Sequence, residues 1–272
     1  MNFSAVSTVI RSENCFMAAL GVAVAVFVAS SGVDYANAPF WLAVLSVFVI
    51  TGAGNAINDY FDREVDKHNA PQRPIPSGNL SPEFVLWFSL GLFLSGILAA
   101  WFINPWCFLL ATINSILLIL YAWKFKGTVL LGNLLVSYMT ASVFIYGGLV
   151  VGSVFVILFL FAIAFLVNLG REIIGDVEDM KGDKKAGLKT LPLRIGAEKS
   201  WLLGKIFIML AVFTGFLPFS LGIMGTYYLI LVLIADVLLI KSVTTTDARS
   251  NQKLTKKGMF VGLVAFLVGA LA

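Results

Sequence analysis

The sequence predicts an all-α polytopic membrane protein, and its composition, its long apolar runs and the placement of its charges each point to that class. Of the 272 residues, 59% are hydrophobic and only 12% are charged, and the mean hydropathy is +0.93. Soluble domains are closer to half apolar and a quarter charged. Apolar runs of about 18 residues or more recur along the chain, and each is long enough to cross a bilayer as a helix.

Nine of these runs are expected to form transmembrane helices packed as a single bundle around a central cavity. We expect residues 1–272 to form a single transmembrane domain. It divides into two halves, roughly 1–125 and 126–272, because each half contains one acidic motif. The nine expected spans are 15–33, 39–57, 84–102, 105–122, 128–147, 152–171, 201–221, 225–241 and 257–272.

The basic residues predict the orientation of the chain. In the nine-span arrangement all 19 Lys and Arg residues fall on one face of the membrane. The positive-inside rule makes this face cytoplasmic and places the N-terminus inside. We therefore expect a multi-pass protein of the cell membrane whose active site faces the cytoplasm. Because the net charge of +4 is concentrated on this surface, it favours anionic lipid heads or phosphorylated substrates.

Cysteine and histidine limit the kinds of metal site that the chain can build. Cys15 and Cys107 both lie in or beside apolar runs, where cysteine is usually a small packing residue. The single histidine, His68, cannot form a His-based metal site. Any metal must therefore be held by oxygen ligands, which favours a hard cation such as Mg²⁺.

An acidic cluster, NDYFDREVD, directly follows the second span at residues 58–66. Asp59, Asp62 and Asp66 are spaced i, i+3 and i+7, so they share one face if the helix continues past Asn58. Carboxylates this close repel one another unless cations intervene. Asn58 adds a neutral oxygen to the set, whereas Asp59 and Glu64 are expected in supporting or solvated roles.

A second acidic cluster repeats this spacing after the sixth span. Asp176, Asp179 and Asp183 each stand 117 residues after their counterparts in the first cluster. Both clusters follow even-numbered spans, so both are expected at the cytoplasmic side. Two such stacks facing each other could hold two or three Mg²⁺ ions. Solvated acidic helix ends are the alternative, but they do not explain why the same spacing occurs twice.

Basic and aromatic residues accompany both clusters. Carboxylates, Mg²⁺ and basic side chains together can grip a diphosphate and stabilise it as a leaving group. Arg73 stands out because it lies in the stiff, proline-rich loop QRPIPSG. Tyrosines within the spans are expected to face the bundle interior. The substrate-binding residues that we expect are Arg11, Asn14, Lys67, Arg73, Tyr121, Lys126, Tyr138, Lys184 and Lys189.

These motifs resemble those of the UbiA-type intramembrane prenyltransferases. NDYFDREVD matches the N-x-x-x-D-x-x-x-D element of that family at Asn58, Asp62 and Asp66. DVEDMKGD matches its second acidic element at Asp179 and Asp183, with Asp176 adjacent. The resemblance covers nearly the whole chain, and it implies that Asn58, Asp62, Asp66, Asp179 and Asp183 bind Mg²⁺. It also implies that the catalytic residues are Asp62, Asp66, Asp179 and Asp183. We add Asp176 to the expected metal ligands because it belongs to the repeated acidic spacing.

Within this family, RPIPSGNLSP and REIIGDVEDMKGDKKAGLKTLP look most like archaeal members that build membrane ether lipids. The resemblance implies Mg²⁺-dependent transfer of a geranylgeranyl group from geranylgeranyl diphosphate to the free hydroxyl of geranylgeranylglyceryl phosphate. That transfer makes the second ether bond and proceeds through an allylic carbocation in a dry pocket. The implied partners are a prenyl diphosphate, a phosphorylated glyceryl ether lipid and membrane lipids, with no nucleic acid.

Three other activities were considered. A prenyltransferase with an aromatic acceptor, as in quinone biosynthesis, stays open because the sequence does not reveal the acceptor pocket. A CDP-alcohol phosphotransferase would need a D-G-x-x-A-R element, which is missing from the sequence. A cation transporter would place its carboxylates near the membrane midplane, whereas these clusters lie at the ends of predicted spans. The oligomeric state is left open.

Overall fold

The computed structural model describes residues 3–30, 37–185 and 187–271. In these residues the regular structure is helical, without a β-strand, which confirms the predicted all-α class. Nine helices of the described chain are long and apolar enough to cross a membrane, as the sequence predicts. The cytoplasmic N-terminus, the central cavity and the single domain stay predictions.

The chain divides into two compact units. Unit 1 comprises Met1–Ala23 and Asp34–Lys126, and unit 2 comprises Val24–Val33 and Gly127–Ala272. The long helix α2 (Ser12–Ser30) contributes its first part to unit 1 and its second part to unit 2. Each unit contains one of the two acidic clusters: residues 58–66 lie in unit 1 and residues 176–183 lie in unit 2.

Unit 1 is an assembly of helices, and capping residues mark the starts of three of them. Asn37, Ser81 and Asn104 each accept a hydrogen bond from a backbone N–H in the first turn of the helix that they precede, and a proline follows each. Such caps satisfy N–H groups that have no partner within the helix. Besides α2, the elements are α1 (Phe3–Ile10), α3 (Ala38–Asn69), α4 (Pro82–Trp101), α5 (Pro105–Leu120) and the π-helical turn η1 (Tyr121–Phe125).

Helix α3 extends well beyond the apolar run that predicted it. The span was expected to end at residue 57, but the helix continues to Asn69. It therefore passes through the whole first acidic cluster without a break. The condition on which the shared acidic face depended, a helix that continues past Asn58, is confirmed.

The loop that follows α3 is anchored in a small apolar core of unit 1. Ile75 and Leu80 from this loop are buried against Val9 of α1, Ala56 of α3 and Val85 of α4. Burying a side chain such as that of Ile75 or Leu80 stabilises the fold by roughly 1.5–3 kcal/mol. The proline-rich loop is thus held against α3, which fixes where its polar residues lie.

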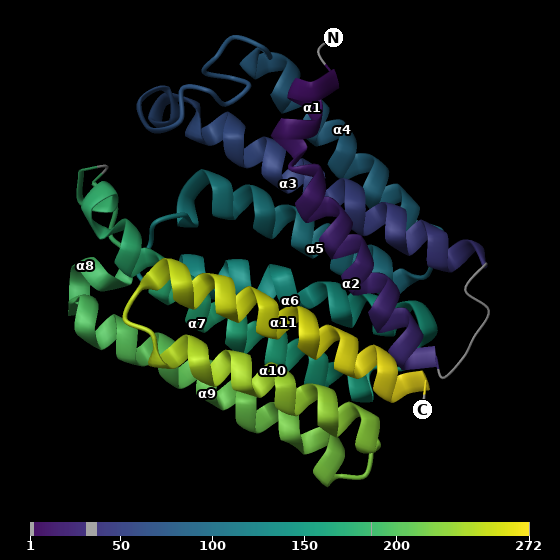
Figure 1. The fold of residues 1–272 in the computed structure, drawn as a ribbon. Coiled ribbons are helices and arrows are strands. Elements are labelled where there is room, and N and C mark those ends of the chain that lie inside the picture. Colours follow the sequence, from purple (N-terminus) through teal and green to yellow (C-terminus); the bar gives the residue numbers. More distant parts are fainter. Residues whose placement is uncertain (1–2, 31–36, 186, 272) are drawn as a thin grey trace. The chain divides into compact units, whose positions relative to one another are not determined.

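Unit 2 contains the remaining long helices. Helix α7 was expected to end near residue 171, but like α3 it continues through its acidic cluster. Two pairs of helices lie side by side along much of their length, α7 with α9 and α10 with α11 (Figure 1). The elements are α6 (Leu131–Val151), α7 (Phe155–Lys185), α8 (Leu191–Ile195), α9 (Ala197–Ser220), α10 (Thr226–Thr244) and α11 (Ala248–Leu271).

Two glycines allow α7 and α9 to approach closely. A Cβ atom added to Gly170 would lie 2.5 Å from the carbonyl oxygen of Gly204, and one added to Gly204 would lie 2.6 Å from Cγ1 of Ile174. Small residues at such crossings let membrane helices pack backbone to backbone. This contact braces α7 one to two turns before its acidic residues. The two cysteines are buried and free, as expected of packing residues.

Candidate active site

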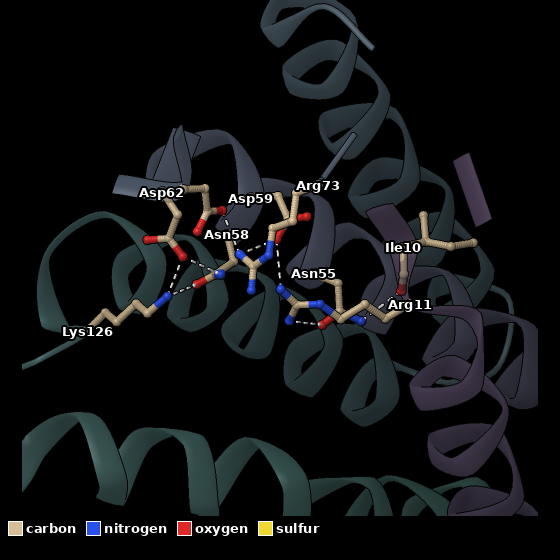
Figure 2. Close-up of polar contacts among 9 residues, drawn as sticks. Ile10, Arg11, Asn55, Asn58, Asp59, Asp62, Arg73 and Lys126 are labelled. Carbon is tan, nitrogen blue, oxygen red and sulfur yellow. Dashed lines mark hydrogen bonds and ion pairs between the residues drawn. The ribbon is translucent and has the colours of Figure 1, made fainter. Parts of the chain in front are cut away.

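The polar side chains of unit 1 gather on one face of α3, which we call the α3 face. Asn55, Asn58, Asp59, Asp62 and Asp66 fall within about 100° of arc around the helix axis, because an α-helix turns about 100° per residue. Three cationic side chains from other parts of unit 1 reach this face (Figure 2). Each of them meets a different aspartate.

Asp59 is the aspartate that Arg11 meets. Its side chain is almost fully buried, with 4% of the residue exposed, and it accepts from Nη2 of Arg11 at 2.7 Å and from Nη1 of Arg73 at 3.5 Å. The sequence indicated a supporting or solvated role, and burial rules out the solvated one. Asp59 instead holds two guanidinium groups beside the residues predicted to bind metal.

Arg11 owes its position to the break between α1 and α2. Its φ of +49°, uncommon for a residue with a side chain, separates the two helices. Nη1 of Arg11 donates to the side-chain oxygen of Asn55 at 3.3 Å, and the amide of Asn55 donates to the carbonyl of Ile10 at 2.8 Å. Asn55, which sequence reasoning missed, thus ties this junction to α3. Its position four residues before Asp59 was the available signal.

Asp66 is the aspartate that Arg73 meets. Only 6% of Asp66 is exposed, and Nη1 of Arg73 donates to its carboxylate at 2.6 Å. Burial lowers the pKa of Arg73, but its hydrogen bond to Asp66 and the charge of Asp59 raise the pKa above its ordinary value. The guanidinium therefore stays protonated, held in place by the anchored loop.

Asp62 is the aspartate that Lys126 meets. The ammonium group of Lys126 donates to the Asp62 carboxylate and lies 3.4 Å from the side-chain oxygen of Asn58, whose amide in turn donates to Asp62 at 2.8 Å. In Figure 2, Lys126 reaches the α3 face from one end and Arg11 from the other.

Lys126 is placed by the π-helical turn η1. Its backbone N–H donates to the carbonyl of Tyr121 at 2.8 Å, a five-residue span that widens the end of the helix. Such π-turns often occur at functional sites. Lys124, which lies inside the turn, and Lys126 are both exposed, and Lys126 is the one whose ammonium group meets Asp62.

The acidic residues of unit 2 gather on α7 in the same way, and we call Asp176, Asp179 and Asp183 the α7 face. The carboxylate of Asp176 accepts from the side-chain amide of Asn133 on α6 at 2.9 Å. Among the residues that the structure describes, no Lys or Arg lies within ion-pair distance of Asp176 or Asp179. Asp176 and Asp179 therefore differ from the aspartates of the α3 face, each of which has a cationic partner.

Two other residues of unit 1 that were predicted to bind substrate, Lys67 and Asn14, have side chains that do not join the α3 face. Lys67 projects away from the α3 face and pairs with the exposed Glu64 at 2.8 Å. Asn14 has an exposed side chain, although its backbone N–H donates to the carbonyl of Arg11 at 2.8 Å. Neither side chain joins the network of Figure 2.

In unit 2, the predicted lysines follow the α7 face along the chain. Lys184 and Lys189 are both exposed, and the backbone N–H of Lys189 donates to the carbonyl of Gly127 at 3.0 Å. Tyr138 lies on α6, where its ring meets Phe161 of α7 edge to face, with 6.2 Å between centroids. A substrate-binding role for these three residues stays a prediction.

The donor set on both faces suits Mg²⁺. It consists of carboxylate oxygens, with the amide oxygen of Asn58 on α3, and these are the ligands that hard cations prefer. Within the described residues, no three Asp, Glu, His or Cys side chains converge on one point, because the aspartates are spaced along the axes of their helices. Metal binding by these residues stays a prediction.

Comparisons with known proteins place this arrangement in a family. The model of the UbiA prenyltransferase family matches residues 18–264. A protein named digeranylgeranylglyceryl phosphate synthase from Methanopyrus kandleri is 45% identical over 267 residues, which cover 96% of this chain and 97% of that protein.

Solved structures agree with the sequence comparison. A structure described as that of a digeranylgeranylglyceryl phosphate synthase has a TM-score of 0.85 and 36% identity, with 98% of each chain covered. A UbiA homolog from Archaeoglobus fulgidus bound to DMAPP and Mg²⁺ has a TM-score of 0.70 and 17% identity, with 96% of this chain and 98% of that chain covered, so it supports the fold alone. The match of the family model and these full-length similarities show that the chain belongs to the UbiA prenyltransferase family.

Proposed function

We propose that this chain transfers a geranylgeranyl group from geranylgeranyl diphosphate to the free hydroxyl of geranylgeranylglyceryl phosphate, which forms the second ether bond of an archaeal membrane lipid. The observation that carries the proposal is the 45% identity over nearly the full length to a digeranylgeranylglyceryl phosphate synthase. The two acidic faces and the cations around them supply the chemistry that this reaction needs.

The two acidic faces are the proposed metal sites. Asn58, Asp62 and Asp66 on α3 and Asp176, Asp179 and Asp183 on α7 would each contribute oxygen ligands. Mg²⁺, when bound, supplies positive charge that neutralises a diphosphate and stabilises it as a leaving group. The catalytic assignment to Asp62, Asp66, Asp179 and Asp183 follows from this role.

The cations of unit 1 are the proposed diphosphate ligands. A guanidinium carries five N–H groups and an ammonium three, so Arg11, Arg73 and Lys126 retain donors beyond those that contact aspartates. Phosphate oxygens suit both kinds of cation. Because these donors are fixed before substrate arrives, they would stabilise charge on the leaving diphosphate without first reorganising.

We place both acidic faces at the cytoplasmic side of the membrane. The segregation of basic residues in the sequence supports this orientation. A charged diphosphate and a phosphorylated acceptor would then approach from water, while their hydrocarbon chains lie along the apolar parts of the helices.

The experiment combines purified protein with labelled geranylgeranyl diphosphate, Mg²⁺ and a panel of acceptors. We expect ether product with geranylgeranylglyceryl phosphate and none with hydroxybenzoate-type aromatic acids. Asp62→Ala and Asp179→Ala should each lower the rate about 10²-fold or more, since each removes charge that stabilises the leaving group. Glu64→Gln is a matched control, because Glu64 is exposed and lies off the α3 face.

Two outcomes would contradict the proposal. Preferential use of an aromatic acceptor would overturn the assigned substrate. Prenyl transfer that persists in both aspartate variants would overturn the assigned site.

A further inference from the structure

One carboxylate on α7 lies outside the α7 face as the sequence defined it. Glu172 precedes Asp176 by four residues, so it continues the same face by one turn in the direction of the apolar part of the helix. On α3 the matching position, four residues before Asp59, is occupied by Asn55. The two helices therefore carry similar acidic faces, but at this level only α7 has a group that can accept a proton.

A chain of hydrogen bonds fixes Glu172 in place. Arg171 forms an ion pair with the Glu172 carboxylate. Nε and Nη2 of Arg171 also donate to the side-chain oxygen of Asn168, at 3.2 and 2.8 Å. The amide of Asn168 in turn donates to the hydroxyl of Ser137 on α6 at 3.3 Å. The ion pair is thus anchored on two helices of unit 2.

The two ends of this chain differ in burial. Asn168 and Ser137 are 1% and 0% exposed, whereas the Glu172 side chain is 31% exposed. The amide and the hydroxyl therefore form a fixed support inside unit 2, while the Glu172 side chain is partly exposed. A residue that served packing alone would not need this accessibility.

If the proposed function holds, on which this step rests, Glu172 lies along α7 at the level expected for the reacting carbon. Helix rise places Glu172 about 6 Å from Asp176 along the axis, toward the apolar part of the helix. If the diphosphate lies at the α7 face and the prenyl chain runs along the apolar part of the helix, the carbon that joins them lies between. The acceptor hydroxyl must approach that carbon.

We propose that Glu172 is the catalytic residue that accepts the proton of the acceptor hydroxyl. The acceptor oxygen forms a bond to C1 of the prenyl chain, and the bond from C1 to the diphosphate oxygen breaks with its electron pair leaving on the diphosphate. The hydroxyl proton moves to the Glu172 carboxylate and passes to water after the products leave.

The ion pair with Arg171 is compatible with this role. Once the acceptor oxygen bonds to an allylic carbon, its proton becomes far more acidic than a carboxylic acid, so a weak base suffices. Position then matters more than basicity, and the Arg171–Asn168–Ser137 chain supplies position.

Two substitutions at Glu172 separate proton transfer from a structural role. Glu172→Gln keeps the length of the side chain and one acceptor oxygen for Arg171, but an amide does not accept the proton. Glu172→Asp keeps a carboxylate that is one methylene shorter. We expect kcat to fall about 10²-fold in the Gln variant and to be partly restored in the Asp variant, while KM for geranylgeranyl diphosphate changes less than about threefold.

A structural role predicts the opposite order of kcat, with the Gln variant more active than the Asp variant, and that result would overturn the proposal. Glu178→Gln is the control, since Glu178 lies on the same helix but pairs with the exposed Arg249 at 2.7 Å. Retained binding of labelled geranylgeranyl diphosphate by the Gln variant, measured directly, shows that its site is folded. Failure of the wild-type protein to use the glyceryl phosphate acceptor contradicts the proposed function instead, so the two failures are distinguishable.

Discussion

The α3 face and the α7 face have the same spacing of aspartates but a different balance of charge. On α3, Asp59, Asp62 and Asp66 each meet a cationic side chain from unit 1. On α7, Asp176 meets a neutral amide, and Asp179 is exposed. A repeated motif therefore sets where the carboxylates stand without setting what neutralises them. We therefore expect Asp176 and Asp179 to depend more on a cation from solution than the aspartates of the α3 face do.

The effect of this difference that bears most directly on function is expected on Mg²⁺ binding without substrate. An ion that binds Asp62 must compete with Lys126, whereas one that binds Asp179 displaces no protein cation. We expect Asp179→Asn to weaken Mg²⁺ binding about tenfold, or about 1.4 kcal/mol, and Asp62→Asn to weaken it less. Titration calorimetry of the purified protein in detergent measures both.

The same titration carries its own controls. Glu178→Gln should bind Mg²⁺ as the wild-type protein does, because Glu178 projects off the α7 face. Lys126→Met should strengthen binding by removing the competing cation at Asp62. A larger loss of Mg²⁺ affinity in Asp62→Asn than in Asp179→Asn would contradict the expectation that Mg²⁺ binds more readily at the α7 face than at the α3 face.

The sequence predicts the long helices well because their apolar runs match the thickness of a bilayer. Those runs mark the membrane boundary rather than the helix end, so α3 and α7 continue well past the predicted residues 57 and 171. Helices α1 and α8 were missed because they have only 8 and 5 residues, too few for a span.

The partners of the acidic residues were harder to predict than the acidic residues themselves. The spacing within one helix follows from its repeat, so Asp59, Asp62 and Asp66 can be placed together from sequence. Arg11 is 48 residues from Asp59 along the chain, and only tertiary packing brings them together. Likewise, the π-turn that precedes Lys126 has no signature that composition or periodicity reveals.

A second expected effect, on the free energy of unfolding rather than on Mg²⁺ binding, follows when the partner of the first aspartate on each face is removed. Arg11→Ala leaves the buried Asp59 with only the longer contact to Arg73, so we expect a loss of roughly 2–3 kcal/mol of unfolding free energy. Asn133→Ala removes a neutral donor from the partly exposed Asp176, for roughly 1 kcal/mol. SDS-induced unfolding in mixed micelles compares the two.

Double variants test the cause of that loss. If an unpaired buried charge is responsible, Asp59→Asn should restore part of the stability lost in Arg11→Ala. Asp176→Asn should restore less in Asn133→Ala. The proposed difference in charge between the two faces would be wrong if Arg11→Ala and Asn133→Ala lost equal unfolding free energy and neither double variant regained any.

The smallest effect on stability is expected from substitution of Asp247. This residue lies beside Arg249, and variants of the two test whether Arg249 offsets the charge of the α7 face. Asp247 precedes α11 and accepts from the backbone N–H of Ser250 at 2.8 Å, as an N-cap does, and α11 carries Arg249. Hydrogen bonds from the side chain and backbone of Ser250 lower the pKa of Asp247. Because the lowered pKa favours the ionised folded form, its stabilisation is present above the ordinary pKa of aspartate, about 3.9, and is lost as pH falls through the lowered value.

Asp247→Ala should therefore lower the Tm slightly at pH 7, and the difference from wild type should vanish in acid. Thermal scans across pH measure this. Mg²⁺ affinity should be unchanged in Asp247→Ala and in Arg249→Ala, because Arg249 is exposed and pairs with Glu178 rather than with the α7 face. A change of Mg²⁺ affinity in either variant would mean that Arg249 compensates the α7 aspartates, and the contrast between the two faces would narrow.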